Sequence, residues 1–488
     1  MADLFPIVLI SVLVLYVLFV VWLLRTGRLA KWNLSLMLGI VLMQRTHRGK
    51  ATIDFIARPR RFWNLVGDVG IVLTLGGMVA ITLFFLWSVG LALQPHSGVP
   101  ALGVKEIFVI PGVNPFVPLW YGIGALIVTL IVHEGGHGIL ARANGMKLKS
   151  LGLLWLVVPI GAFVEPEELD LKVAPRRVRL RVFGAGPAVN LAFAAVFLTT
   201  FALLMGSLTP NQGAWIGGVS QDARGHDLPA KVAGIQGGDI IVSAARAPQA
   251  GTEREAIADW PALSAFLNHS RPGQDATFGM ADGRDVHLTL VSVWSTLGED
   301  EHANITAGTP AAMETCRQLL APPPETGSDC AARLTARARA GVNPLTPESL
   351  SFLADPFQGS GQGFARLAAL PVAEVLSTPP QPILTVYMPA FYSTPFHAGT
   401  FWVLANLAFW VFWINLMVGI TNILPMLPLD GGHIFREAVG GALGRLRPGL
   451  EAERRDRIVT VAATAMSFLI LGAFVVQIVA PHFLGGLR

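Results

Sequence analysis

The chain has 488 residues, of which 52% are hydrophobic and only 14% are charged. A soluble globular protein carries about 25% charged residues, so this composition predicts an integral membrane protein and excludes an ordinary soluble domain. The formal net charge is only +4, and no basic block is interleaved with aromatic residues, so we expect no nucleic-acid partner.

Six segments are long and apolar enough to cross the hydrocarbon core of a bilayer, which takes about 20 residues. They are Leu4–Leu24, Asp68–Leu93, Val117–Ala141, Val182–Ser207, Phe401–Ile420 and Ile458–Ala480. The first is too long for a signal-peptide core and follows no basic residue, so we expect it to be a retained span. The shorter apolar piece Leu34–Met43 is expected to be interfacial or re-entrant. The pattern predicts a polytopic α-helical membrane protein with about six transmembrane helices.

The basic residues alternate between the loops. Arg25–Arg61 carries nine Lys and Arg, Arg142–Arg181 carries eight and Pro425–Arg457 carries six, whereas Gln94–Phe116 carries only Lys105. Because basic loops remain in the cytoplasm, both termini are predicted to lie outside the cell. The segment between the fourth and fifth spans, Leu208–His397, is then outside as well.

The third span contains three ionisable residues, His133, Glu134 and His137, in the sequence HEGGH. Ionisable side chains at bilayer depth are costly and usually functional. On a helix, residues i and i+4 share one face, so both imidazoles can reach one ion. HExxH is the pattern of zinc proteases, in which the two histidines bind the metal and the glutamate is the general base. The alternative is that the two histidines are ordinary buried residues with hydrogen-bond partners. This alternative does not explain why the Glu134 carboxylate is buried, which is costly.

The outer segment begins with a pattern typical of a small mixed domain. Trp215–Val219 is a short apolar strand, and Pro229–Ile241 predicts a turn, a short helix and a Gly-Gly-Asp turn into a strand. Asp259–Asn268 is helix-like, and Ala276–Val291 alternates as a hairpin that turns at Asp282-Gly283.

The rest of the outer segment, Thr296–Phe396, shows no clear pattern of helices or strands. Cys316 and Cys330 face an oxidising compartment in this topology, so a disulfide is expected, with two reduced thiols as the alternative.

A catalytic zinc takes three protein ligands and keeps one position open for water. The third ligand is expected in Asn422–His433, NILPMLPLDGGH, where Asp430 follows a helix interrupted by Pro425 and Pro428. Broken backbone at membrane depth is tolerated only where protein or a cavity satisfies it, so this carboxylate can turn inward. A cytoplasmic helix cap is the alternative for Asp430.

HEGGH in a membrane span together with NILPMLPLDGG resembles the site-2 protease family of intramembrane zinc metalloproteases. The resemblance implies that His133, His137 and Asp430 bind one Zn²⁺ per chain and that Glu134 is catalytic. It implies further that Asn422 lies near the active site, and that Gly186 and Asn190, in FGAGPAVN, match the family's GxxxN motif. This chain departs from the family's pattern at Leu427, where many members have a second proline, with Pro428 next.

Two further stretches resemble parts of the same family. PAKVAGIQGGDIIVSA is similar to the PDZ signature of membrane proteases, and Leu151–Glu168 is similar to the membrane-associated β-hairpin, whose extended edge is expected to hold an unwound substrate. The implied domains are a membrane core at 1–207 with four spans, an extracytoplasmic mixed α/β PDZ-like domain at 208–295, an insert at 296–398 and a second membrane core at 399–488 with two spans. The placement of spans and PDZ-like domain is similar to the archaeal and eukaryotic branch.

The resemblance implies an enzyme that hydrolyses peptide bonds within or near transmembrane segments of membrane proteins. Its expected partners are transmembrane substrates, the lipid bilayer and peptide C-termini at the PDZ-like domain. We expect a multi-pass protein of a prokaryotic cell membrane, with an archaeal one as an option, and with the active site towards the cytoplasm. A cation or zinc transporter and an inactive PDZ scaffold are the alternatives. The transporter predicts inverted repeats and ionisable residues on several spans, which the sequence lacks, and the scaffold needs no Glu134.

Overall fold

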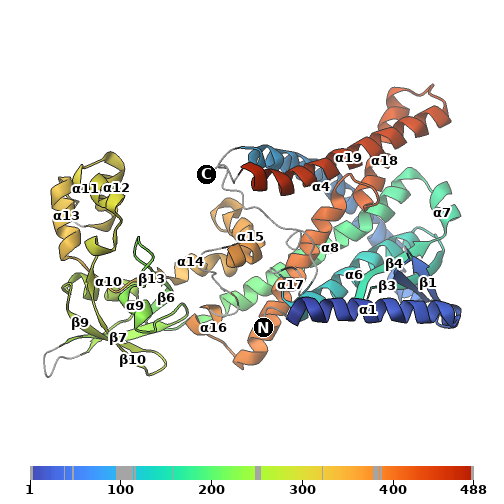
Figure 1. The fold of residues 1–488 in the computed structure, drawn as a ribbon. Helices are drawn as coiled ribbons and strands as arrows, with labels where there is room; N and C mark the ends of the chain where they lie inside the picture. Colours follow the sequence, from blue (N-terminus) through green and yellow to red (C-terminus); the bar gives the residue numbers. More distant parts are fainter. Residues whose placement is uncertain are drawn as a thin grey trace. The chain divides into compact units, whose positions relative to one another are not determined.

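The computed structural model describes residues 4–94 without 38, 47 and 48, and then residues 111, 114, 117–156, 158–247, 254–320, 323–376, 384 and 387–484. The chain divides into two compact units (Figure 1). The first unit is Met1–Thr200 with Leu407–Arg488, and the second is Phe201–Asn406. Lys105 and Pro379–Pro382 lie outside the described residues.

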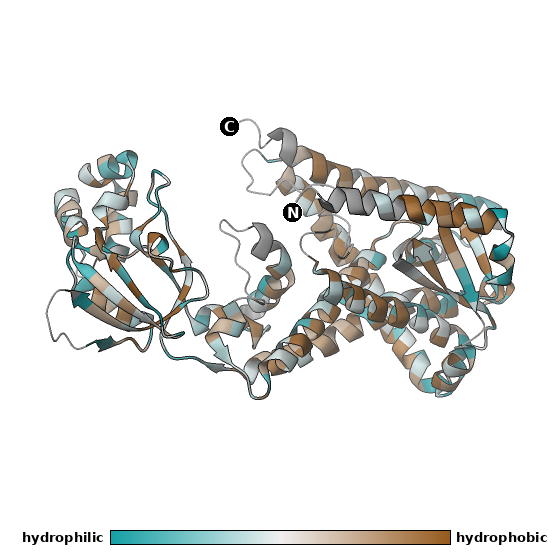
Figure 2. Cartoon of the chain, turned by 60° about the horizontal axis from the view of Figure 1, so that its bottom comes forward, coloured by the Kyte–Doolittle hydropathy of each residue, from teal (hydrophilic) through white to brown (hydrophobic). Residues whose placement is uncertain are grey.

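Among the described residues, five helices are long and apolar enough to cross a membrane, and they match five of the predicted spans. They are α4 (Arg60–Ala92), α6 (Leu119–Ala143), α8 (Arg176–Gly206), α17 (Ala398–Ile423) and α19 (Ala452–Leu484). Figure 2 shows apolar residues along these helices, and side chains such as Leu83, Phe84 and Val196 are exposed as lipid-facing residues would be. The protein is therefore a multi-pass membrane protein.

The first predicted span coincides with helix α1 (Leu4–Arg25). Within this helix, Val14–Arg25 is the apolar stretch that can be assessed. It is shorter than the about 20 residues that a membrane crossing takes, so a sixth span stays a prediction.

The first unit also contains a four-stranded antiparallel sheet, ordered β1-β2-β3-β4. The strands are β1 (Leu34–Met37), β2 (Val41–Thr46), β3 (Leu148–Leu156) and β4 (Val158–Pro166). The apolar piece at Leu34–Met43 therefore belongs to a β-hairpin that extends the expected β3–β4 hairpin. β4 forms one edge of this sheet, and it packs against α6.

Short helices complete the first unit: α2 (Arg28–Lys31), α3 (Lys50–Ile56), α7 (Glu168–Val173) and α18 (Asp430–Leu446). Ile53, Leu140 and Val182 join α3, α6 and α8 in one buried cluster. At the same end, the Asp68 carboxylate of α4 accepts two hydrogen bonds from each of Arg177 and Arg181 of α8, at 2.7–2.9 Å. Apolar packing and these charge-assisted bonds together fix the starts of α4 and α8 beside the end of α6.

The second unit is built on a six-stranded sheet, ordered β10-β9-β7-β6-β13, with β8 beside β7. Its strands are β6 (Ala214–Val219), β7 (Ile240–Ala247), β8 (Glu255–Ala256), β9 (Asp275–Met280), β10 (Asp285–Thr289) and β13 (Val342–Leu345). The predicted strand, short helix and hairpin are confirmed, with α9 at Pro229–Val232 and the hairpin turning at Gly283 in the left-handed region. The helix α10 (Trp260–Asn268) is also confirmed, and Asp259 caps it by accepting from Ala262 N at 2.9 Å.

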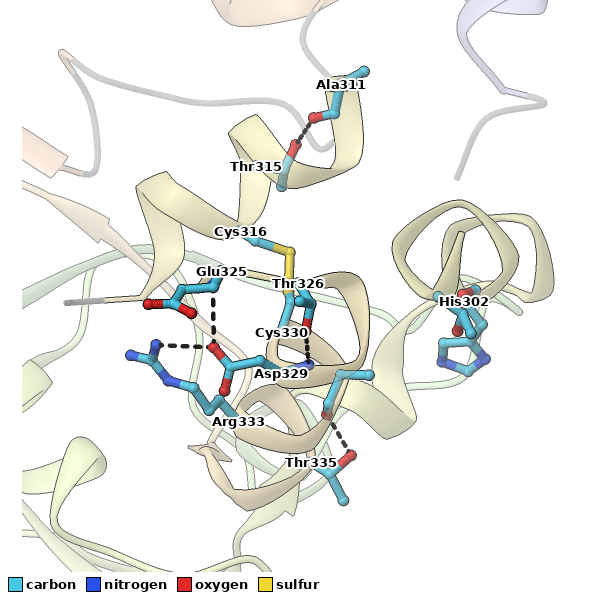
Figure 3. The surroundings of a disulfide bond; sticks show 12 residues. His302, Ala311, Thr315, Cys316, Glu325, Thr326, Asp329, Cys330, Arg333 and Thr335 are labelled. Atoms are coloured by element: carbon cyan, nitrogen blue, oxygen red, sulfur yellow. Dashed lines mark hydrogen bonds and ion pairs between the residues drawn. A yellow bond between two sulfur atoms is a disulfide. The ribbon is translucent and has the colours of Figure 1, made fainter. Parts of the chain in front are cut away.

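Strand β13 comes from beyond residue 295 and pairs antiparallel with β6, from Val342 opposite Val219 to Leu345 opposite Trp215. Three helices precede it: α11 (Glu299–Thr306), α12 (Pro310–Leu319) and α13 (Gly327–Ala336). Cys316 and Cys330 are joined by a disulfide between α12 and α13, as Figure 3 shows, so the expected bridge is confirmed. The two sulfurs lie in a buried cluster with Ile305, Leu320 and Leu334.

The remaining elements of the second unit are short pieces and one longer helix. They are β5 (Thr209–Pro210), β11 (Val291–Ser292), β12 (Ala338–Arg339), α14 (Pro347–Leu350), α15 (Gln362–Leu376), α16 (Met388–Phe391) and β14 (Tyr392–Ser393), with three single 3₁₀ turns.

Candidate metal centre

Helix α6 supplies two of the three candidate ligands. His133 and His137 are one helical turn apart, and their Nε2 atoms lie 3.3 Å from each other. The planes of the two rings are nearly perpendicular, at 80°, so the rings do not stack while their Nε2 atoms converge. The i, i+4 spacing read from HEGGH thus produces one convergent pair.

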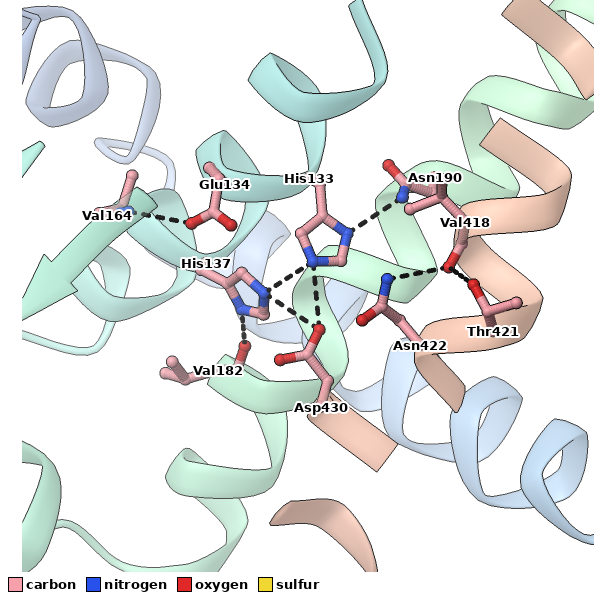
Figure 4. Close-up of polar contacts among 10 residues, drawn as sticks. All are labelled: His133, Glu134, His137, Val164, Val182, Asn190, Val418, Thr421, Asn422 and Asp430. Carbon is pink, nitrogen blue, oxygen red and sulfur yellow. Dashed lines mark hydrogen bonds and ion pairs between the residues drawn. The ribbon is translucent and has the colours of Figure 1, made fainter. Parts of the chain in front are cut away.

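Asp430, the first residue of α18, reaches the same point. Its Oδ2 atom lies 3.2 Å from His133 Nε2 and 3.3 Å from His137 Nε2 (Figure 4). The first turn of α18 folds closely against the end of α17, because a side chain at Gly431 would overlap the carbonyl oxygens of Ile423 and Leu424. The two glycines after Asp430 therefore allow the chain to bring this carboxylate back to α6.

The three ligand atoms fit a zinc ion. A tetrahedral zinc with bonds of about 2.0–2.1 Å to nitrogen and oxygen spaces its ligand atoms about 3.3 Å apart. The three separations here are 3.2, 3.3 and 3.3 Å. Asp430 Oδ2 is also buried and accepts no hydrogen bond from the described residues, which is costly unless a cation lies beside it. His133, His137 and Asp430 are thus a group that can hold a metal ion.

The opposite nitrogens of both imidazoles are held by α8. His137 Nδ1 donates to the carbonyl oxygen of Val182 at 2.7 Å, and His133 Nδ1 lies 3.0 Å from the Asn190 amide. A histidine whose Nε2 is a ligand carries its proton on Nδ1. A half-turn of the Asn190 amide places its oxygen, which is buried without a partner, where it accepts a hydrogen bond from the Nδ1–H group of His133. Both contacts fix the rings with Nε2 towards Asp430.

Gly186 lies against the Nε2 edge of the two histidine rings. A Cβ atom at this position would approach His133 Cε1 to 2.6 Å and His133 Nε2 to 2.7 Å, and would overlap His137 Nε2. The glycine therefore leaves the space that the rings occupy. Of the three residues expected beside the site, Gly186 and Asn190 lie against the histidines.

Asn422 is not drawn into the ligand group. Its amide is turned towards that group in Figure 4, but its hydrogen bond goes to Val418 O of its own helix, at 3.0 Å.

Glu134 is not among the ligand atoms. Its Oε2 accepts a hydrogen bond from the backbone N–H of Val164 on β4, at 2.9 Å. Its side chain lines an apolar cleft of about 750 Å³ between α3, α6 and the sheet, whose lining also includes Gly135 and Phe163. The carboxylate therefore lies between the ligand group and the cleft edge formed by β4.

Sequence reasoning did not find two contributors to the site, the Val182 carbonyl and the Val164 N–H. Both are backbone groups, so no residue type at these positions could have indicated them. The family motif FGAGPAVN indicated that α8 contributes to the site. It pointed to Gly186 and Asn190, however, and not to the backbone carbonyl of Val182.

Comparison with known proteins places the chain in a family. A family model described as peptidase family M50 matches residues 121–470, which include the HEGGH helix and Asp430. The chain is 26% identical over 362 residues to zinc metalloprotease Rip1 of Mycobacterium tuberculosis, an alignment covering 64% of this chain and 82% of that protein. It is also 26% identical over 377 residues to Rip1 of Mycolicibacterium smegmatis, covering 65% and 85%.

An archaeal protein is among the relatives as well. An uncharacterized protein of Methanocaldococcus jannaschii is 32% identical over 203 residues, or 41% of this chain. The chain spans about half of that relative's length, 52%. Because the family match covers most of the sequence, the chain belongs to peptidase family M50, the site-2 protease family of intramembrane zinc metalloproteases.

Proposed function

We propose that His133, His137 and Asp430 hold the zinc of this intramembrane metalloprotease and that Glu134 is its general base. The observation that carries the assignment is the convergence of two Nε2 atoms and one Oδ2 atom at 3.2–3.3 Å. These residues come from segments almost 300 positions apart in the sequence, so helix packing alone gives no reason for their meeting at one buried point.

The chemistry is peptide-bond hydrolysis. A zinc ion held by these residues would lower the pKa of the attacking water towards about 7 and would polarise the scissile carbonyl. Glu134 removes a proton from that water and then donates it to the leaving amine. The Val164 N–H orients the carboxylate for this role by holding one oxygen, which leaves the other free.

The apolar cleft beside Glu134 fits an unwound transmembrane segment. A helical substrate hides its carbonyls in hydrogen bonds, so the scissile peptide has to become extended. Among the described strands, β4 pairs with β3 alone, and the Val164 N–H points to Glu134, away from β3. The same free edge can pair with an extended substrate, as peptides pair with exposed strands. Gly and Pro in the substrate span favour the unwinding.

The orientation follows the distribution of basic residues. Because basic residues gather at the start of α8 and around α18, we infer that both lie on the cytoplasmic side and that the zinc group lies towards the cytoplasm. The termini and the PDZ-like domain of the second unit are extracytoplasmic in this arrangement.

We propose that the PDZ-like domain is a filter on substrate size. A PDZ domain usually captures a peptide as an added strand. Here β13 of the same chain already pairs with β6, and the Tyr387 hydroxyl donates to the Gly217 carbonyl on that strand. The occupied edge favours exclusion of substrates with bulky outer domains over capture of peptide C-termini.

Cleavage of a single-span membrane protein by the purified full chain in liposomes tests the proposed chemistry. Wild-type protein should cut within or near the span, at a position that mass spectrometry identifies, and a chelator should stop the reaction until zinc is restored. Glu134→Gln should reduce cleavage by about 10²–10⁴-fold, the usual contribution of a general base. A variant that cleaves within tenfold of wild type would remove Glu134 from the mechanism.

A further inference from the structure

A second cavity lies in the first unit, away from the cleft. It has a volume of about 770 Å³ and is lined by residues of α7, the start of α8, α18 and the start of α19. Five basic residues line it against two acidic ones. The basic residues are Lys172, Arg176, Arg179, Arg436 and Arg455, and the acidic ones are Glu437 and Asp456. The proposed protease chemistry uses none of these side chains.

Glycines on α18 create this space. Gly440, Gly441 and Gly444 lie on its wall. The Arg176 guanidinium occupies the place where a side chain at Gly441 would be, and Arg455 Nη1 lies 3.4 Å from the Cβ position of Gly444. Two arginines from different helices therefore approach the same bare face of α18.

The acidic residues do not satisfy these two arginines. Glu437 is held by Arg179 through two hydrogen bonds of 2.8 Å, and its nearest approach to Arg176 Nε is 4.0 Å. Arg176 Nη2 donates to Ala438 O at 3.1 Å, but Arg176 Nε is buried without a hydrogen-bond partner. Among the described residues, the Arg455 side chain has no ion pair. A buried guanidinium nitrogen without an acceptor is costly, and an anionic oxygen is its strongest acceptor.

The position of the cavity indicates the kind of anion. The membrane helices α8 and α19 both begin here, at Arg176 and Ala452. The cavity therefore lies at the level of an interface, on the side where the loops are basic. Basic pockets between transmembrane helices on the cytoplasmic side bind phosphate-containing lipid head groups. Leu171, Phe183 and Val459 add apolar surface to the lining, which suits the adjoining glycerol and acyl chain.

We propose that this cavity binds the phosphate group of an anionic ligand, with Arg176 and Arg455 as donors. An anionic phospholipid and a free phosphate share this chemistry. Either ligand joins α8 and α19 across α18 by pairing with the guanidinium groups of Arg176 and Arg455.

The test measures ligand binding by the purified full chain in detergent, so it does not depend on protease activity. Native mass spectrometry compares phosphatidylglycerol with phosphatidylcholine, and the unfolding temperature is followed with added inorganic phosphate. Arg455→Gln is compared with Arg454→Gln, a neighbour on α19 that does not line the cavity. Zinc content and circular dichroism confirm that both variants are folded.

We expect phosphatidylglycerol to bind more tightly than phosphatidylcholine, and Arg455→Gln to weaken its binding by about fivefold, the usual effect of one basic side chain near an anionic surface. Arg454→Gln should leave binding unchanged. If instead inorganic phosphate raises the unfolding temperature, and Arg455→Gln alone removes that rise, the ligand is a free phosphate and the site is the same. Equal weakening by both variants, or no binding of either ligand, would overturn the proposal.

Discussion

The two histidine rings leave no room for a side chain at residue 186. The closest atoms to a Cβ there belong to His133 and His137, whereas Gly135, also beside the site, has nothing within 4 Å of its Cβ position. At the scale of single residues, the arrangement of the ligands therefore requires a glycine at position 186 as well as the ligands themselves. The contacts of Asn190 and Val182 then set which nitrogen of each ring faces Asp430.

This contrast gives a matched pair of variants. Gly186→Ala should displace the rings and weaken zinc affinity by at least about tenfold, comparable with the loss of a group that orients a ligand. Gly135→Ala should retain zinc, since its methyl group meets open space. Both changes replace a helical glycine by alanine, so their effects on helix propensity cancel. Competition with a zinc chelator measures the affinity, and equal retention by the two proteins would contradict the geometry.

At the scale of elements, the edge of β4 connects the ligand helix to the cleft. Val164 N–H points away from β3, and in an antiparallel ladder the N–H two residues away points to the same side. The N–H of Ala162, which lines the cleft, therefore points to the edge where an extended substrate would pair.

Ala162→Pro removes this donor without touching a hydrogen bond to β3. We expect kcat/KM for a single-span substrate to fall about fivefold, the effect of one lost hydrogen bond, with zinc content unchanged. Ala162→Val keeps the N–H and is the control for a larger side chain. Should the proline variant cleave as efficiently as the valine variant, the substrate does not pair with this edge.

Elements with a strong side-chain pattern could be predicted from the sequence, and those that depend on pairing partners could not. The i, i+4 histidines and the apolar runs indicated α6 and four other long helices. The motif around Asp430 indicated the third ligand only through its family resemblance, because an Asp before a helix is equally a cap. Leu34–Met43 is apolar in a way that fits several structures, and only the pairing of β1 with β2, and of β2 with β3, makes it part of the sheet. β13 is four residues long and contains Pro344, so nothing local indicated a strand.

At the scale of the whole molecule, the second unit contains one sheet whose strands come from both sides of residue 295. Because Trp215 and Leu345 are strand partners, residues 214–345 can be replaced by a short glycine linker that joins neighbouring points. This replacement removes the sheet together with the disulfide helices and leaves no orphan strand.

If the PDZ-like domain is a size filter, the cleavage of a substrate should depend on which end of its span carries a folded domain. A model span with a folded domain on the side of the second unit should be cleaved poorly by wild-type protein and well after the replacement. The same folded domain attached at the cytoplasmic end should make no difference to either protein. Gel-based cleavage assays measure both. Inhibition by a cytoplasmic domain instead would invert the orientation, and no inhibition by either would exclude a filter.

The zinc content of the Asp430→Ala protein tests the central claim most directly. Elemental analysis of purified wild-type protein should give about one zinc per chain, and Glu134→Gln should keep it, because Glu134 lies outside the ligand group. Asp430→Ala should lose most of its zinc, since two imidazoles alone leave the ion without its third protein ligand. Full zinc occupancy in folded Asp430→Ala protein would contradict the account.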